Sequence, residues 1–64
     1  MYRQYDLRSD DARLTAWLDD ASLRVGTLVV LRGDEHERWW EVVRRHDPVL
    51  SQPPEKRWRV GGLL

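Results

Sequence analysis

The two histidines are the first residues of this chain that could do chemistry, and His36 lies in the acidic run DEHE at residues 34–37. Imidazole and carboxylate groups bind zinc where three or four of them converge. His36 and His46, however, lie at opposite ends of one expected strand. At about 3.3 Å per residue, they would be about 33 Å apart. The pattern favours a solvated turn, so we expect neither a metal site nor a cofactor.

Nucleophilic catalysis lacks its usual residues in this chain. There is no cysteine. The serines fall in cap or loop contexts: Ser9, Ser22 and Ser51. His46 and Asp47 are sequence neighbours, a poor arrangement for an acid that must orient the imidazole from behind. Gly61-Gly62 precedes no helix and therefore does not form a phosphate-binding loop. We expect that the chain is not an enzyme, has no catalytic residues and takes no small-molecule substrate.

Tryptophan and arginine supply the binding chemistry. The chain has four tryptophans, and Lys56 is its single lysine among eleven basic residues. These side chains stack on planar groups, pair with carboxylates or phosphates, and are enriched at interface hot spots. The expected binding residues are Arg38, Trp39, Glu41, Val43, Arg45, Arg57 and Arg59. The preference for arginine also fits GC-rich codon usage, which indicates a high-GC bacterium or a phage or plasmid living in one.

Strands are expected to position these residues. Residues 27–32 and 38–45 are rich in β-forming residues and flank the turn 33–36, which predicts a hairpin. A loop with three prolines follows, and a third strand is expected at 56–60. Strand side chains alternate between faces, so Trp39, Glu41, Val43 and Arg45 would share one face, while Trp40 and Val42 share the other. One of the adjacent tryptophans is therefore expected in the core and the other half exposed.

A helix is predicted over residues 9–22. Leu14, Trp17, Leu18 and Ala21 fall on one face of a 3.6-residue period, and Ser9 or Asp10 could cap its start. Residues 1–8 are expected to form an extended arm or a short strand with Tyr5 and Leu7 on one face. The predicted fold class is α+β, mostly β, with the helix docked on a small curled antiparallel sheet.

The length of the chain and its net charge limit the classes of function that it could have. Sixty-four residues indicate one small domain. Eleven basic and eleven acidic residues cancel, which argues against broad electrostatic binding to nucleic acid or to a membrane surface. The longest apolar run, 28–31, is far too short to span a bilayer, and no signal peptide is recognised. A chain without cysteine fits a reducing compartment, so the expected location is the cytoplasm.

The segments VGTLVVLRG, RWWEVV and KRWRVGGL resemble the strand pattern of SH3-like small β-barrels, the group that includes Tudor-type and KOW-type modules. The resemblance covers residues 25–64, with the predicted helix as an N-terminal addition. It implies a barrel-like sheet. No motif of the group that carries a function is recognised, and function does not follow from fold alone.

Three functions remain from the sequence. The first is a non-catalytic protein-interaction module, a small adaptor or inhibitor that docks a partner protein or a second copy of itself through Trp39 and its strand neighbours. The second is a nucleic-acid-binding protein in which Trp39 or Trp58 stacks on an unpaired base within a basic strand face. The third is a structural subunit of a larger assembly such as a phage particle.

Overall fold

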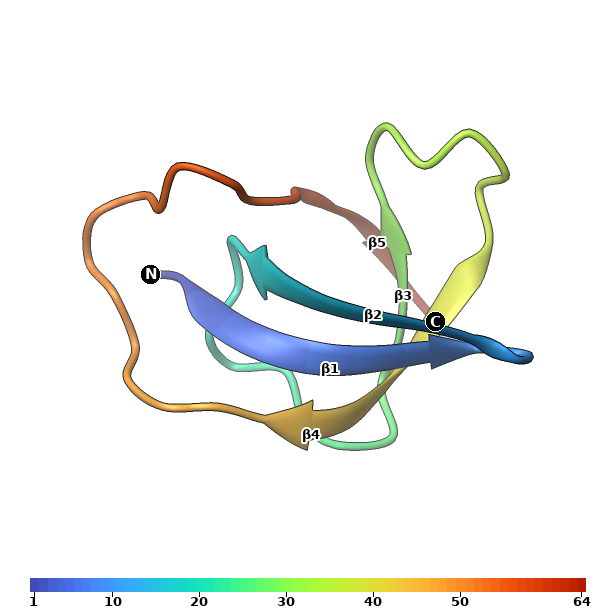
Figure 1. Cartoon of the computed structure of the whole chain (residues 1–64), viewed down its shortest axis with the longest axis horizontal. Helices are drawn as coiled ribbons and strands as arrows, with labels where there is room; N and C mark the ends of the chain where they lie inside the picture. Colours follow the sequence, from blue (N-terminus) through green and yellow to red (C-terminus); the bar gives the residue numbers. More distant parts are fainter.

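Five antiparallel strands make up the fold. The computed structural model describes residues 1–64 and contains no helix (Figure 1). The strands are β1 (Arg3–Ser9), β2 (Ala12–Leu18), β3 (Leu28–Leu31), β4 (Trp39–Arg45) and β5 (Val60–Leu63). They form one sheet in the order β2-β1-β4-β3-β5. The chain is therefore all-β, and the predicted α+β class is wrong.

The predicted helix at 9–22 is replaced by the end of β1, a tight turn, β2 and the start of a loop. Leu14 and Leu18 are four residues apart, a spacing that fits one helix face but equally fits one strand face, because four is even. Trp17 decides between the two. A helix would place it beside Leu18, whereas in the sheet Leu18 is fully buried and Trp17 lies half-buried on the opposite face.

Pairing with β1 is what makes residues 12–18 a strand. All seven residues of β2 are in register with β1, from Arg3 opposite Leu18 to Ser9 opposite Ala12. Asp10 and Asp11 form the connecting turn, with Asp10 in the left-handed region at φ 52°. An aspartate tolerates that conformation better than most residues. Asp10, the residue that could cap the predicted helix, therefore lies in a hairpin turn.

The N-terminal segment forms a strand from Arg3 onward rather than an arm. β1 lies between β2 and β4, so both of its backbone edges are paired. Tyr5 and Leu7 share its inner face, and both side chains are fully buried. A central position explains how so short a segment is held in the sheet.

The hairpin expected at 27–32 and 38–45 is confirmed. Leu28 lies opposite Glu41, and Val30 lies opposite Trp39, in the antiparallel pair β3–β4. The third strand was predicted in the wrong place. Residues 56–59 are not part of β5, which begins at Val60 and includes both Gly61 and Gly62. Gly61 allows this approach, since a Cβ there would lie 3.2 Å from Arg32 Cγ.

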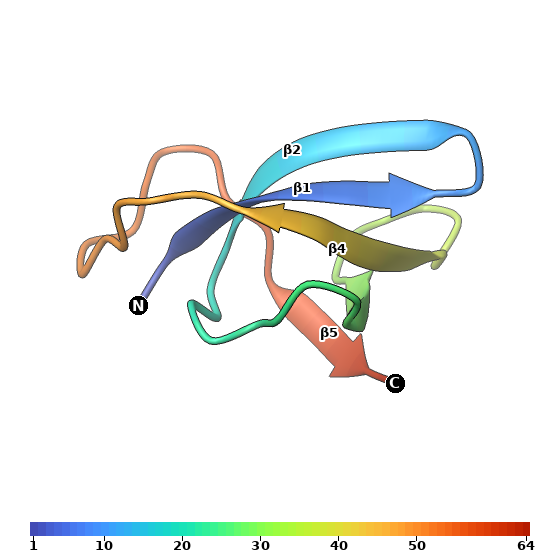
Figure 2. The same cartoon turned by 90° about the horizontal axis from the view of Figure 1, so that it is seen from below.

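The sheet curls around a small core and almost closes on itself. Figure 2 shows β2, β1 and β4 side by side in one curved layer, with β5 beneath them. Trp58 N–H donates to Trp17 O at 2.8 Å, which joins the far end of β2 to the segment before β5. The core consists of Tyr5, Leu7, Ala16, Leu18, Leu23, Val29, Leu31, Trp40 and Val42. None of the chain forms a helix that could cross a membrane.

Candidate functional site

The adjacent tryptophans of β4 point to opposite faces, as the alternation of a strand requires. Trp40 is buried at 6% exposure, whereas Trp39 is 43% exposed on the outer face. Trp40 Nε1 donates to Asp34 Oδ2 at 3.2 Å, but the Trp39 indole makes no hydrogen bond within the chain. The prediction of one buried and one half-exposed indole is therefore confirmed, and Trp39 is the exposed one.

Apolar residues surround Trp39 on the outer face of the neighbouring strands. Trp39 lies opposite Val30, and Val30 lies opposite Gly62 on β5, so the three residues form one row across the sheet. Leu28 lies in the next row, and Leu64 extends it, donating its N–H to Leu28 O at 3.1 Å. Residues opposite one another share a face. We call this set of residues the apolar outer patch; it consists of Leu28, Val30, Trp39, Gly62 and Leu64.

The ion pair between Arg8 and Glu41 lies at one side of the apolar outer patch. Glu41 is opposite Leu28 on one side and Arg8 on the other, and Arg8 Nη2 donates to Glu41 Oε1. Glu41 was a predicted binding residue, and the structure places it at the rim with its charge already paired. Arg8 was missed. The signal that could have found it is the alternation of β1, in which Arg8 follows the buried Leu7 and so faces outward.

Arg45 does not share the face of Trp39, contrary to the strand alternation. A bulge interrupts the β1–β4 pairing: Leu7 is opposite Val42 but Asp6 is opposite Arg44, which leaves Val43 without a partner. A bulge re-aims the side chains that follow it. Arg45 therefore lies on the side of the buried Tyr5.

Arg38 is engaged inside the chain. Its Nε lies 3.6 Å from Asp34 Oδ2, and its guanidinium carbon lies 5.3 Å from the centre of the Trp40 ring. Asp34 also accepts hydrogen bonds from the backbone N–H groups of His36 and Arg38, both at 3.3 Å. Burial raises the pKa of Asp34, but the hydrogen bonds from Trp40, His36 and Arg38 outweigh it and hold that pKa below its ordinary value. The turn at residues 34–37 thus holds the buried Trp40 through its bond to Asp34.

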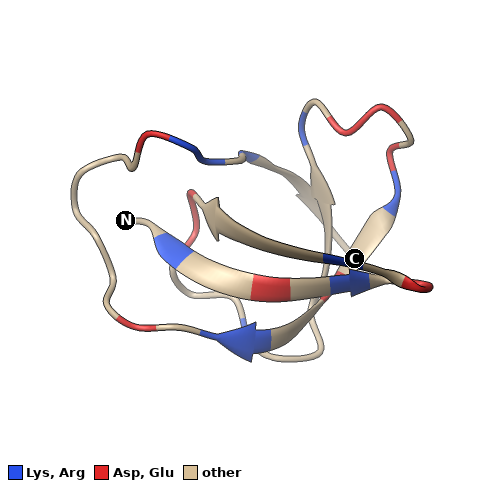
Figure 3. Ribbon diagram, viewed as in Figure 1, with Lys and Arg blue, Asp and Glu red and all other residues tan.

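Arg57 and Arg59 lie apart from the apolar outer patch, in the segment before β5. They line a hollow of about 330 Å³, whose other lining residues are Tyr2, Asp19, Arg32 and Val60. Figure 3 shows their basic stretch separated from the acidic residues of the β3–β4 loop. The structure therefore does not bring the predicted binding residues together on one face. Trp39, Glu41 and the half-buried Val43 belong to the outer side of β4, while Arg38, Arg45 and the pair Arg57 and Arg59 lie elsewhere.

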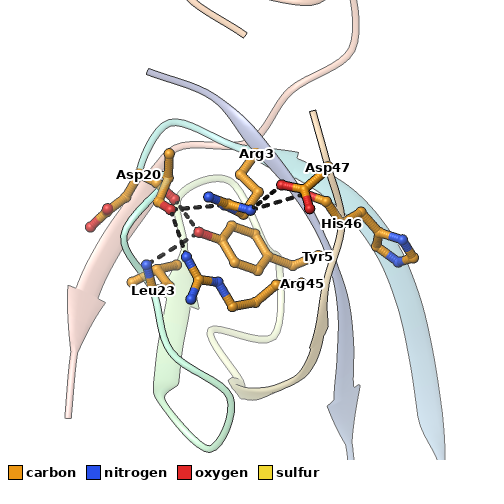
Figure 4. Close-up of polar contacts among 8 residues, drawn as sticks. Arg3, Tyr5, Asp20, Leu23, Arg45, His46 and Asp47 are labelled. Carbon is orange, nitrogen blue, oxygen red and sulfur yellow. Dashed lines mark hydrogen bonds and ion pairs between the residues drawn. The ribbon is translucent and has the colours of Figure 1, made fainter. Parts of the chain in front are cut away.

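A buried tyrosine organises the loop after β2. Tyr5 Oη donates to Asp20 O at 2.7 Å and accepts from Leu23 N at 3.2 Å. Figure 4 shows its ring between the side chains of Arg3 and Arg45. Arg3 Nε donates to Ala21 O at 2.9 Å, while Arg45 Nη2 lies at the longer distance of 3.5 Å from the same oxygen.

The ionisation of Tyr5 fits a structural role. Burial raises the pKa of its phenol above the ordinary value of 10.0, so the side chain is neutral at physiological pH. A neutral hydroxyl can donate and accept at once, which the bonds to Asp20 and Leu23 require. Tyr5 therefore ties the loop after β2 to β1 at Asp20 and Leu23.

His46 pairs with neither the other histidine nor its neighbour Asp47. Its Nε2 lies 2.9 Å from Asp6 Oδ1, which also accepts from Thr15 Oγ1 at 2.8 Å. The hydrogen bonds from His46 and Thr15 lower the pKa of Asp6. No group of three or more histidine, aspartate or glutamate side chains is arranged to hold a metal ion.

Comparison with protein families, with curated proteins and with solved structures gives no match for this chain. What the chain does is therefore argued from the arrangement of its own residues.

Proposed function

We propose that this chain is a non-catalytic protein-interaction module, and that the apolar outer patch docks a partner protein. The observation that carries the proposal is the exposed Trp39, set in a row of apolar neighbours across three strands. Leu64 adds a second large apolar side chain, at 82% exposure. Contiguous exposed apolar surface marks interaction sites, and tryptophan is the residue most enriched among interface hot spots.

The chemistry of the patch favours a protein partner over nucleic acid. Arg8, which lies on β1 opposite Glu41, is already paired with Glu41. Arg38 is likewise paired with Asp34. An indole that stacks on a base needs free cations beside it to bind the backbone. An apolar surface whose neighbouring arginines Arg8 and Arg38 are already paired instead suits a partner whose facing surface is apolar and uncharged.

The fold suits this role as a rigid scaffold. The bridge between Leu18 and Trp58 nearly closes the sheet, as in the SH3-like small β-barrels that the strand pattern resembles, and we propose that the chain uses its sheet as such a barrel does. A small adaptor or inhibitor of this kind would act in the cytoplasm, which agrees with the absence of cysteine.

Site-specific photo-cross-linking tests the proposal. A benzophenone amino acid replaces Trp39 in the cells that encode the chain, and a control chain carries it at Arg13, which is exposed on β2. We expect a discrete protein adduct from position 39 and none from position 13. Leu64→Asp in the same chain should weaken the adduct, since Leu64 is exposed and its replacement leaves the core intact.

The other outcomes decide against the proposal or refine it. An adduct between two copies of the chain supports the proposal and identifies the partner as a second copy. An adduct with nucleic acid at position 39, or equal labelling from positions 39 and 13, overturns it. A particle of many copies, seen by mass measurement in solution, would instead support the structural subunit.

A further inference from the structure

A hollow lined by Arg32, Arg57 and Arg59 brings three basic side chains together at a place separate from the apolar outer patch. Its volume of about 330 Å³ is at the small end of ligand pockets. Tyr2, Asp19 and Val60 complete its lining, and none of its residues belongs to the apolar outer patch. We propose that this hollow is an anion site that takes the phosphate group of a small phosphorylated molecule.

The three guanidinium groups have no acidic partner in the chain. The ion pairs of the molecule use Arg3, Arg8, Arg38 and His46. Arg32, Arg57 and Arg59 are exposed and make none of them. Three like charges around one small hollow repel one another, and an anion between them removes that repulsion.

Backbone contacts hold these arginines in place. Arg32 N donates to Arg59 O at 2.9 Å, so the two side chains start from hydrogen-bonded neighbours. Arg57 Nη1 donates to Pro54 O at 2.9 Å, which uses one donor of its guanidinium and leaves the others for a ligand. Gly61 makes room for the Arg32 side chain, because a Cβ would lie 3.2 Å from Arg32 Cγ. The fold therefore fixes the backbone positions of Arg32 and Arg59 and the guanidinium of Arg57.

The one carboxylate of the hollow is also engaged. Asp19 Oδ1 accepts the N–H of Val60 at 2.9 Å. Its charge offsets one of the three guanidinium charges, which leaves the hollow positive overall. The acid ties the end of β2 to the start of β5, and so holds the two sides of the hollow together.

Phosphate is the anion that suits this set of donors. Guanidinium groups bind phosphate oxygens in bidentate fashion, and a terminal phosphate offers three oxygens and up to two charges to several of them. A carboxylate offers one charge and two oxygens, too few for three arginines. The Tyr2 ring at the edge of the hollow can contact the remainder of a small molecule. A confined hollow fits a terminal phosphate better than the continuous backbone of a nucleic acid.

Titration of the full chain with inorganic pyrophosphate tests the site. NMR of the arginine Nε–H groups is the readout, with sodium chloride at matched ionic strength as the control. We expect the signals of Arg32, Arg57 and Arg59 to shift together and to saturate. Arg59→Gln should weaken the binding at least about tenfold, the loss typical of one charge-assisted hydrogen bond. Gly61→Ala, whose Cβ would lie 3.2 Å from Arg32 Cγ, removes no charge and should weaken the binding less than Arg59→Gln does.

Matched controls separate a built site from general attraction. Arg24→Gln removes an exposed arginine outside the hollow and should leave the affinity unchanged. Equal losses in Arg24→Gln and Arg59→Gln, or shifts reproduced by sodium chloride, would overturn the proposal. Tighter binding of a single-stranded oligonucleotide than of pyrophosphate would overturn the assignment to a small molecule. The Trp39 cross-linking result does not affect either outcome, because the two sites share no residue.

Discussion

The inner and outer faces of β4 each carry a tryptophan, and the two indoles differ in burial and in hydrogen bonding. On the inner face, Trp40 is buried, its N–H is bonded to Asp34, and Arg38 lies over its ring. On the outer face, Trp39 is half exposed and its N–H has no partner in the chain. A buried indole needs its polar atom satisfied, whereas an exposed one can bond to water until a partner arrives. The difference indicates that Trp40 stabilises the fold, whereas Trp39 is the indole to which our proposal assigns binding.

The inner face gives the largest expected effect. Trp40→Ala removes a large core side chain, and also removes one hydrogen-bond donor from Asp34 and the ring beneath Arg38. We expect a loss of about 3–5 kcal/mol, which would unfold so small a domain. Chemical denaturation followed by circular dichroism measures it. A folded Trp40→Ala variant of nearly normal stability would show that the inner face is not the main source of stability.

Tyr5→Phe tests the polar part of the interior. The substitution keeps the ring and removes the hydroxyl, which leaves Asp20 O and Leu23 N unpaired beneath the loop. A loss of about 1–3 kcal/mol is expected, because buried unpaired groups cost that much. Hydrogen exchange at the Leu23 amide should accelerate more than exchange at Val29. Equal acceleration at both amides would mean that the hydroxyl does not hold the loop specifically.

Acid should weaken the molecule through its bonded carboxylates. In the folded chain, the pKa values of Asp6, Asp20 and Asp34 all lie below the ordinary value of 3.8. The unfolded chain therefore binds more protons, and the stabilisation is complete above pH 3.8 and is lost as the pH falls below it. Unfolding measured between pH 6 and about 2 should show this decline. Asp34→Asn should make the decline shallower. An unchanged slope would mean that the ionised Asp34 carboxylate does not stabilise the fold through its bond to Trp40.

The smallest effect is expected from the ion pair at the rim of the apolar outer patch. Arg8 and Glu41 are both partly exposed, so their mutual attraction is screened by water. A double-mutant cycle with Arg8→Gln and Glu41→Gln should give a coupling of about 0.2–1 kcal/mol in stability. A coupling as large as the loss in Tyr5→Phe would mean that the outer face contributes to stability like the inner one.

Local sequence patterns predicted the β3–β4 hairpin and its divided tryptophans, because both strands and their turn lie within one continuous segment. The helix prediction failed since the even spacing of Leu14 and Leu18 suits both structures, and only the partner strand β1 selects between them. The position of Arg45 depends on a bulge set by pairing with Asp6 and Leu7, far away in sequence. Contacts of this kind leave no signal in the local pattern.

The candidate sites were predictable to different degrees. Trp39 and Glu41 were predicted from strand alternation, but their apolar neighbours on β3 and β5 follow from the register between strands. Arg57 and Arg59 were predicted as binding residues from their type. The hollow they line also needs Arg32 and Tyr2, which the near-closure of the sheet brings to them. The side chains could be read from the sequence, whereas their grouping is a product of the fold.

The free energy of unfolding of Trp39→Ala, measured beside that of Trp40→Ala, tests the central claim most directly. A half-exposed indole without a hydrogen bond should cost about 1 kcal/mol when it is removed, and the variant should stay folded. Such a result would agree with an indole available for a partner. A loss as large as that of Trp40→Ala would place Trp39 among the residues that hold the fold together, and the apolar outer patch would have no docking role.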